Sequence, residues 1–220
     1  MGELLKRTLT GMLVVGSVVG TILAGKLFFA ALLCIVLAFC YSESLHLCPL
    51  RKSPLYGVLF LLYITVGLAC LYLLYDYAGV YVVLGFFVLI WISDIFAYIT
   101  GSLWGKHKLC PKISPSKTWE GAIGGGVLAI LWGYVWKLWF LPDTGSMEWV
   151  LLSIFVIVAG MAGDLLESAV KRKAGVKDSG KFLPGHGGML DRFDSALLAA
   201  PVALIVCFIL NLFSDGILFA

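Results

Sequence analysis

Charged residues are scarce in this sequence. Only 13% of its 220 residues are Asp, Glu, Lys or Arg, whereas soluble domains carry about a quarter. Apolar residues make up 61% of the chain, which is more apolar surface than a soluble core can absorb. This composition argues against an ordinary soluble domain and predicts a chain in contact with lipid. The net charge of +3 gives little support to nucleic-acid binding, so we expect no nucleic-acid partner.

Metal-binding and redox motifs are also missing. The six cysteines form no C-x-x-C pair, four of them lie in apolar runs, and no His/Cys cluster has zinc spacing. We therefore expect the cysteines to be small apolar side chains in helices rather than disulfide partners or ligands. An apolar run follows Lys6 and Arg7 without a small-residue cleavage site before a polar domain. We interpret this run as the first membrane span rather than as a signal peptide.

Long apolar runs divide the chain into about seven predicted membrane spans. A helix needs about 20 mostly apolar residues to cross the hydrocarbon layer and satisfies its own backbone hydrogen bonds there. We place the spans near residues 8–25, 27–45, 55–75, 80–99, 121–141, 149–167 and 195–213. The predicted fold class is an all-α integral membrane protein. We divide it into N-terminal transmembrane helices at 1–80 and a second transmembrane domain at 81–220, with cytoplasmic loops at 100–120 and 168–194.

Basic residues indicate the orientation of these spans. With a cytoplasmic N-terminus, all of the sixteen Lys and Arg residues except Lys26 and Lys137 fall in cytoplasmic stretches. The positive-inside rule therefore predicts an N-terminus inside and a C-terminus outside. Two motifs of small residues, Gly16-x-x-x-Gly20 and Gly121-x-x-x-Gly125, predict close contacts between helices.

Acidic residues gather at the predicted cytoplasmic ends of the spans, where a carboxylate is costly unless it has a partner or a task. They are Asp94, Glu120, Asp164, Glu167, Asp191 and Asp194. The spacing of Asp164, Ser168 and Lys171 places them on one helix face. Mg²⁺ prefers carboxylate oxygens together with substrate phosphates. The residues leave open a second reading, in which Asp164 or Asp191 forms an interfacial ion pair with Lys171 or Arg192.

Phosphate-binding candidates lie beside these acids. Lys117, Lys171, Arg172 and Lys177 are close to predicted helix ends, whereas Lys106 and Lys173 suit lipid head groups. The run 114–120 offers hydroxyls and a helix N-terminus, which favours anions. The turn 184–188, which contains His186, has glycines that allow its backbone to approach a phosphate. Together these features predict phosphoryl or nucleotidyl transfer on a lipid, without naming the nucleotide or the lipid.

The segment SAVKRKAGVKDSGKFLPGHGGMLDRFD, residues 168–194, resembles the signature of the phosphatidate cytidylyltransferase family. That signature consists of S-x-x-K-R, four residues, K-D, a spacer, H-G-G and D-R-x-D. Its fixed positions are filled by Ser168, Lys171, Arg172, Lys177, Asp178, His186, Gly187, Gly188, Asp191, Arg192 and Asp194. Upstream, Asp94 with Ala97-Tyr98, the segment 101–108, Ser114-Pro115 and Lys117-Thr118-x-Glu120-Gly121 are similar to a second block of the family.

The resemblance implies an enzyme that transfers the cytidylyl group of CTP to phosphatidate, giving CDP-diacylglycerol and pyrophosphate for phospholipid synthesis. Because the attacking phosphate is already anionic, no general base is required. The implied metal ligands for Mg²⁺ are Asp164 and Asp191, with Asp194 in support and a second cation not excluded. The implied phosphate-binding residues are Lys171, Arg172, Lys177 and Arg192, and Asp178 and His186 complete the catalytic set. The implied substrate-binding residues are Asp94, Ser114, Lys117, Thr118, Glu120 and Ser168.

The resemblance also implies a bacterial inner membrane location, an active site that faces the cytoplasm, contact with membrane lipid and a homodimer. It covers residues 90–200 and weakens before them. The chain is shorter than typical bacterial members, which we interpret as fewer N-terminal spans. This shortening bears on substrate access and oligomer contacts more than on chemistry.

Other functions are weighed against the same residues. A CTP-dependent lipid kinase would need a base or metal to activate a hydroxyl, and the full signature argues against it. A CDP-alcohol phosphotransferase would carry a spaced D-G-x-x-A-R motif, which this sequence lacks. A transporter would place its acids near the membrane midplane, whereas these acids cluster at one face. A scaffold without catalysis is the least favoured reading.

Overall fold

A computed structural model describes residues 3–47, 54–180, 182 and 187–213. Its elements are α1 (Glu3–Ala24), α2 (Lys26–Leu47), α3 (Pro54–Ala78), α4 (Val80–Trp104), β1 (Lys108–Cys110), β2 (Ser114–Thr118), α5 (Trp119–Phe140), α6 (Ser146–Lys173) and α7 (Leu190–Phe213). Helices α2 to α7 each contain a run long and apolar enough to cross a membrane, and α1 contains a shorter apolar helix, Thr8–Ala24. The predicted seven-helix integral membrane fold is therefore confirmed.

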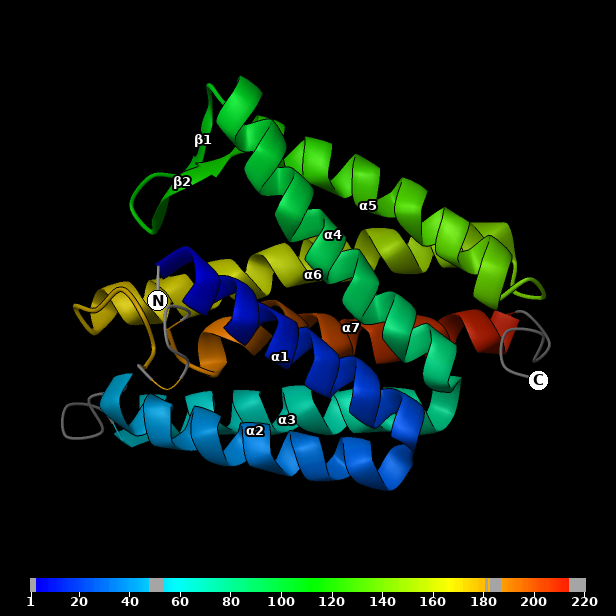
Figure 1. Ribbon diagram of the computed structural model, residues 1–220, viewed down its shortest axis with the longest axis horizontal. Coiled ribbons are helices and arrows are strands. Elements are labelled where there is room, and N and C mark those ends of the chain that lie inside the picture. Colours follow the sequence, from blue (N-terminus) through cyan, green and yellow to red (C-terminus); the bar gives the residue numbers. More distant parts are fainter. Residues whose placement is uncertain (1–2, 48–53, 181, 183–186, 214–220) are drawn as a thin grey trace.

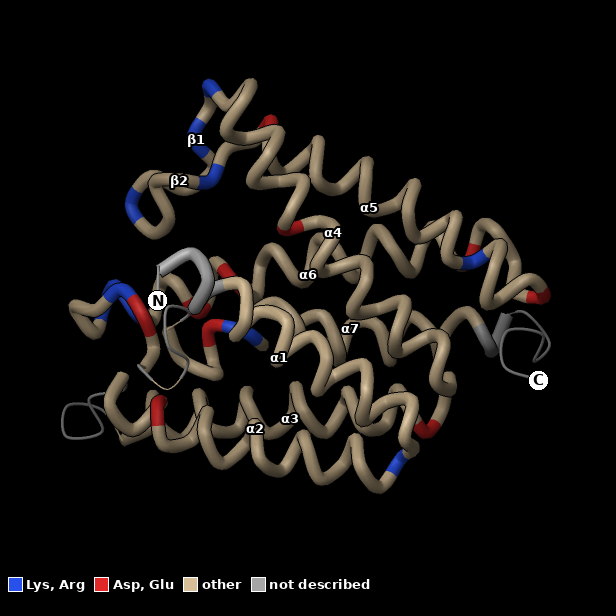
Figure 2. The backbone as a smooth tube through the Cα atoms, in the orientation of Figure 1, with Lys and Arg blue, Asp and Glu red and all other residues tan. Residues whose placement is uncertain are grey.

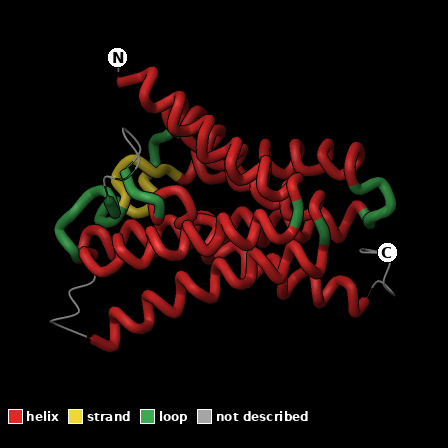
Figure 3. The backbone as a smooth tube through the Cα atoms, turned by 60° about the horizontal axis from the view of Figure 1, so that its bottom comes forward, coloured by secondary structure: helices red, strands yellow, loops and turns green. Residues whose placement is uncertain are grey.

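The helices lie side by side, and α7 lies at the centre of their packing (Figure 1). Helix α7 packs against α6 on one side and against α3 on the other, while α4 packs extensively against α5. The contact between α3 and α7 joins the N-terminal helices to the later ones. Turned forward in Figure 3, the structure shows β1 and β2 at one end of the bundle, and the loop between α5 and α6 at the other end. The start of α7 therefore lies where the two halves of the chain meet.

The structure shows the state of five cysteines and the contacts of Lys26 and Lys137, the two lysines outside the predicted cytoplasmic stretches. Cys34, Cys40, Cys70, Cys110 and Cys207 are free thiols, as expected for five of the six. Lys26 forms an ion pair with Asp76, and Lys137 donates a hydrogen bond from Nζ to the carbonyl of Pro142 at 3.0 Å. Most of the remaining basic side chains lie at the end of the bundle that carries the hairpin (Figure 2). The orientation of that end in the membrane stays a prediction.

Two helices extend further than hydropathy predicts. Helix α6 ends at Lys173 rather than near 167, and α7 begins at Leu190 rather than near 195. The added turn of α6 contains the good helix formers Ala169, Lys171, Arg172 and Lys173, and its basic side chains are favoured at the negative end of the helix dipole. Much of the predicted loop 168–194 is therefore helical, which corrects that boundary. As a result, Asp191 and Asp194 are held by the first turns of a helix.

The predicted loop 100–120 contains an antiparallel hairpin. Strand β1 pairs with β2, with Lys108 opposite Thr118 and Cys110 opposite Ser114. Thr118 ends β2 and caps α5, because its Oγ1 accepts a hydrogen bond from the backbone N–H of Gly121 at 3.1 Å. Such caps typically contribute about 1 kcal/mol. In the described part of the chain, this small sheet accompanies the helices and holds the polar residues of 114–118 against them.

Only one of the two glycine motifs makes the predicted helix contact. A Cβ at Gly121 would lie 2.7 Å from the Ala97 carbonyl oxygen of α4, and a Cβ at Gly125 would lie 2.6 Å from that of Ser93. Glycine at both positions lets α4 and α5 approach closely. At Gly16 and Gly20 an added Cβ would meet nothing within 4 Å. The prediction of a close helix contact at Gly16-x-x-x-Gly20 is therefore wrong for the described part of the chain. The spacing of small residues alone does not show which helix would pack against them.

Replacing Gly125 with alanine is expected to destabilise the bundle. The new methyl group would push α4 away from α5, and overpacking of this kind typically costs about 1–3 kcal/mol. Gly126→Ala is the matched control, because its nearest atom lies 3.7 Å away. The measurement is thermal unfolding of both variants in the same detergent. Equal melting temperatures for the two variants would contradict the close contact.

Candidate active site

A cavity of about 510 Å³ lies between α4, the hairpin, α5 and α6. Its polar lining consists of Ser93, Asp94, Tyr98, Ser102, Lys108, Ser116, Lys117, Thr118 and Asp164. Hydroxyls, two ammonium groups and two carboxylates therefore face one space. Its volume is in the range of small-molecule sites in proteins. The predicted candidates Asp94, Lys117, Thr118 and Asp164 are brought together here from three separate elements, α4, β2 and α6.

An ion pair links the hairpin to α6 at the cavity. Lys117 of β2 pairs with Oδ2 of Asp164, and the Ser168 hydroxyl donates a hydrogen bond to Oδ1 of Asp164 at 3.2 Å. The two charged side chains remain 27% and 24% exposed. Both are therefore partly accessible to a ligand in the cavity.

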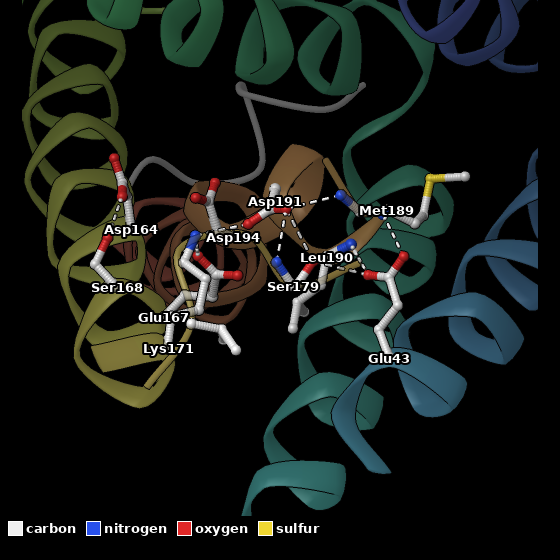
Figure 4. A network of polar contacts seen from close by, with 12 residues as sticks. Glu43, Asp164, Glu167, Ser168, Lys171, Ser179, Met189, Leu190, Asp191 and Asp194 are labelled. Carbon is white, nitrogen blue, oxygen red and sulfur yellow. Dashed lines mark hydrogen bonds and ion pairs between the residues drawn. The ribbon is translucent and has the colours of Figure 1, made fainter. Parts of the chain in front are cut away.

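Asp191 forms the centre of a second group of contacts (Figure 4). Its Oδ2 accepts hydrogen bonds from the Ser179 backbone N–H and hydroxyl, each at 3.0 Å, and from the Gly188 N–H at 2.7 Å. Its Oδ1 accepts one from Nζ of Lys171 at 2.6 Å. The side chain is only 7% exposed. Asp191 therefore organises the loop between α6 and α7 and ties it to the end of α6.

Two further acids near this centre, the buried Glu167 and the partly buried Asp194, lack full compensation. Lys171 lies 2.5 Å from Glu167 Oε2, yet neither carboxylate oxygen of Glu167 accepts a well-formed hydrogen bond from the described residues. The Glu167 side chain is 1% exposed. Asp194 accepts a hydrogen bond from the Ser195 N–H at 2.6 Å, and its charge interacts with those of Asp94 and Asp164. Negative charge is therefore concentrated here.

The charge balance of the site favours a bound cation. Its carboxylates are Asp94, Asp164, Glu167, Asp191 and Asp194, whereas only Lys117 and Lys171 form ion pairs with them in the described part of the chain. Hard carboxylate oxygens suit Mg²⁺, which is usually bound by one or two carboxylates plus substrate phosphates and water. The described residues contain no group of three or more His, Cys, Asp or Glu side chains arranged around a metal position. Binding of Mg²⁺ by these carboxylates stays a prediction.

Comparison with known proteins identifies the family. The profile of the cytidylyltransferase family matches residues 52–210, most of the chain. The chain belongs to the cytidylyltransferase family. Curated proteins named phosphatidate cytidylyltransferase are similar to it: those of Staphylococcus haemolyticus, Staphylococcus aureus and Haemophilus influenzae are 47%, 44% and 41% identical over 130, 130 and 129 residues.

These alignments cover only part of each protein. They include 58% of this chain for the two staphylococcal proteins and 57% for the Haemophilus protein. The same alignments cover 49% of each of the two staphylococcal proteins and 45% of the Haemophilus protein. The chain therefore spans about half the length of the curated relatives it matches. The cytidylyltransferase match includes the cavity, Asp164 and Asp191, whereas α1 and α2 precede it.

Several predicted residues of this cytidylyltransferase-family chain lie outside the cavity. Arg172 donates from its guanidinium to the carbonyls of Ile113 at 3.2 Å and Val176 at 3.1 Å. It therefore fastens the hairpin turn to the end of α6. Glu120 accepts hydrogen bonds from the backbone N–H of His107 at 3.2 Å and pairs with His107 Nδ1 at 2.6 Å. This contact closes the base of the hairpin.

The remaining signature positions of the family are more exposed. Lys177 and Asp178 lie exposed in the loop after α6, and Arg192 lies exposed in the first turn of α7. The charge of Arg192 interacts with Asp94. Ser114 begins β2 and does not line the cavity, and His186 lies outside the described residues. A phosphate role for Lys177 and Arg192 stays a prediction.

One buried acid escaped sequence reasoning. Glu43 of α2 is 6% exposed and accepts hydrogen bonds from the Ser179 hydroxyl at 2.9 Å and from the N–H groups of Met189 and Leu190 at 2.8 and 2.9 Å. The available signal was an acid inside the otherwise apolar run 27–45, which is costly without a partner. Its partners are 136 to 147 residues away, and no local pattern names them.

Proposed function

We propose that this chain transfers the cytidylyl group of CTP to phosphatidate, giving CDP-diacylglycerol and pyrophosphate. The observation that carries the proposal is the placement of two lysine–aspartate pairs at one end of the bundle. Lys117 meets Asp164 at the cavity, and Lys171 meets Asp191 at the start of α7. These four residues lie in the segments that resemble phosphatidate cytidylyltransferases. Relatives with that name align with more than half of the chain.

We propose that Asp164 and Asp191 hold Mg²⁺ together with substrate phosphates, with Asp194 contributing negative charge. The neighbouring acids Glu167 and Asp194 support this assignment, because the carboxylates of the site outnumber the two lysines that pair with them, and an added cation would offset the excess charge. Bound Mg²⁺ supplies charge neutralisation of the α-phosphoryl group and of the departing pyrophosphate. The Lys117 and Lys171 ammonium groups form ion pairs with the same two aspartates.

The chemical step requires positioning more than proton transfer. A phosphatidate phosphate oxygen attacks the α-phosphorus of CTP, a new P–O bond forms, and the bond from the α-phosphorus to the bridging oxygen breaks to release pyrophosphate. Lys117 and Lys108 line the cavity and would bind the CTP phosphates. Hydroxyls of Ser93, Ser102 and Ser116 would orient the nucleotide. Catalysis then rests on in-line alignment and preorganised positive charge.

The location of the site suits a lipid substrate. The hairpin, the end of α6 and the start of α7 lie at one end of apolar helices that can span a membrane. A phosphate group at the level of lipid head groups could therefore reach the site while its acyl chains stay in lipid. We propose that this end faces the cytoplasm of a bacterial inner membrane, since most basic residues lie there. A homodimer stays a prediction.

The proposal is tested with purified protein in detergent, labelled CTP, phosphatidate and Mg²⁺. We expect labelled CDP-diacylglycerol that disappears when EDTA is added. A parallel reaction replaces phosphatidate with a long-chain prenol, the substrate of the rival lipid kinase. Phosphorylated prenol without any CDP-lipid would assign the chain to that kinase class. A folded preparation that forms neither product would refute both enzymatic assignments.

A further inference from the structure

Glu43 connects the N-terminal helices to the signature loop through a buried carboxylate. Its Oε2 accepts hydrogen bonds from the Ser179 hydroxyl and the Leu190 N–H, and its Oε1 accepts one from the Met189 N–H. Met189 and Leu190 supply N–H groups at the start of α7, which are otherwise unpaired at a helix N-terminus. The positive end of the helix dipole further favours a carboxylate there. Glu43 therefore caps α7 from a different helix.

Two glycines of the segment between α6 and α7, Gly180 and Gly188, fit closely around this carboxylate. A Cβ at Gly188 would collide with the Ser179 hydroxyl and with Oε2 of Glu43, and a Cβ at Gly180 would lie 2.7 Å from Oε1. Any side chain at either position would displace Glu43. The backbone at Gly180 and at Gly188 therefore encloses the Glu43 carboxylate.

Ser179 joins Glu43 to Asp191. Its hydroxyl lies 2.9 Å from Glu43 Oε2 and 3.0 Å from Asp191 Oδ2, and its backbone N–H donates to the same Asp191 oxygen. A single hydroxyl proton can serve only one of the two carboxylates at a time. The Ser179 backbone N–H keeps its bond to Asp191 whichever acid the hydroxyl serves, so Ser179 links the two carboxylates, while Lys171 holds the other Asp191 oxygen. Movement of Glu43 would be transmitted to Asp191 through Ser179 and through the first turn of α7.

We propose that Glu43 is a positioning residue that sets the orientation of Asp191 for the cation and phosphates, so that α2 forms part of the catalytic apparatus. Glu43 lies outside residues 52–210, so the family match assigns it no role. The inference rests on the proposed function for its kinetic readout. Outer contacts of this kind typically change metal affinity or activity by about 10–100-fold when removed.

The test compares Glu43→Gln, Ser179→Ala and the double variant with the wild-type chain. Glutamine keeps the size of the side chain, but its amide N–H₂ group would face an N–H donor and could not accept a hydrogen bond from it. We expect kcat to fall by about 10–100-fold and the Mg²⁺ concentration for half-activation to rise, with little change in the KM for phosphatidate. Because both residues act on Asp191, the two losses should be less than additive. The matched control is Glu148→Gln, in the first turn of α6 at the opposite end of the bundle.

A second readout separates this inference from the proposed function. Binding of Mn²⁺, followed by the electron paramagnetic resonance signal of free Mn²⁺, needs no turnover and should weaken in Glu43→Gln but not in Glu148→Gln. Weakened Mn²⁺ binding in a chain that forms no CDP-diacylglycerol would refute the proposed function alone. Variants with lower melting temperatures but wild-type kcat and Mn²⁺ affinity would show a purely structural role and overturn the inference. If Glu43→Gln does not fold, Ser179→Ala decides, because it removes the bridge and leaves the α7 cap.

Discussion

Replacing Asp191 with asparagine is expected to lower kcat by about 10²–10³-fold, the largest loss among the variants considered. Asparagine lacks the negative charge that interacts with Lys171 and with the proposed Mg²⁺. Its N–H₂ group would also face a hydrogen-bond donor instead of accepting a hydrogen bond from it. The donors are the Lys171 ammonium at 2.6 Å and the Ser179 and Gly188 N–H groups at 3.0 and 2.7 Å. Removing one partner of a buried charge pair typically costs about 3–5 kcal/mol. Initial rates over a Mg²⁺ titration measure the effect.

The control for this variant is Asp143→Asn, an exposed residue in the loop between α5 and α6 at the opposite end of the bundle. It makes the same chemical change and should keep the wild-type rate. Circular dichroism and a thermal melt of both variants separate loss of fold from loss of chemistry. A folded Asp191→Asn protein with a rate within about twofold of the wild-type rate would contradict the assignment of Asp191 to the site, since preorganised electrostatic groups normally contribute far more.

Replacing Lys117 with methionine should produce the second largest loss, about 10–100-fold in kcat/KM for CTP. A hydrogen bond between a charged donor and a phosphate is worth about 1.5–3 kcal/mol, and methionine keeps the apolar stem while it removes the ammonium. Lys117 is the hairpin cation that faces Asp164 in the cavity. Its loss would also leave Asp164 without its ion-pair partner. Steady-state kinetics with CTP as the varied substrate measure the change.

Lys112→Met provides the matched control on the same hairpin. Lys112 lies exposed in the turn between β1 and β2 and does not line the cavity. A general weakening of attraction between the basic hairpin and anionic lipid would affect both variants alike. Equal kinetics for Lys117→Met and Lys112→Met would therefore contradict a specific phosphate contact for Lys117.

Hydropathy predicted the helices well because the membrane demands one kind of structure in each long apolar run. It could not predict where α6 ends and α7 begins, because residues 168–173 and 190–194 contain charged side chains and extend these helices beyond the apolar region. The hairpin was missed because its register depends on contacts with the helices, such as the Arg172 guanidinium bound to the Ile113 carbonyl. Local patterns of Lys, Pro and Ser carry no sign of such distant partners.

For the site, the sequence predicted that these acids lie at one end of the bundle, and it predicted part of their pairing. Its alternative reading paired Asp164 or Asp191 with Lys171 or Arg192. The structure confirms the pair of Asp191 with Lys171, whereas Asp164 pairs with Lys117. Glu120, a substrate candidate, contacts His107. The contacts of Glu43 could not be predicted, because the groups that donate hydrogen bonds to it come from a loop and a helix far along the chain. Ion pairing and catalysis use the same residue types, so only geometry separates them.

The most direct test of the central claim follows each phosphate of CTP. Wild-type chain is incubated with phosphatidate, Mg²⁺ and CTP labelled either at the α-phosphate or at the γ-phosphate. Attack on the α-phosphorus by the lipid phosphate predicts label in the lipid product only from α-labelled CTP, and label in pyrophosphate only from γ-labelled CTP. Label in the lipid from γ-labelled CTP would mean phosphoryl transfer and would contradict cytidylyl transfer at this site.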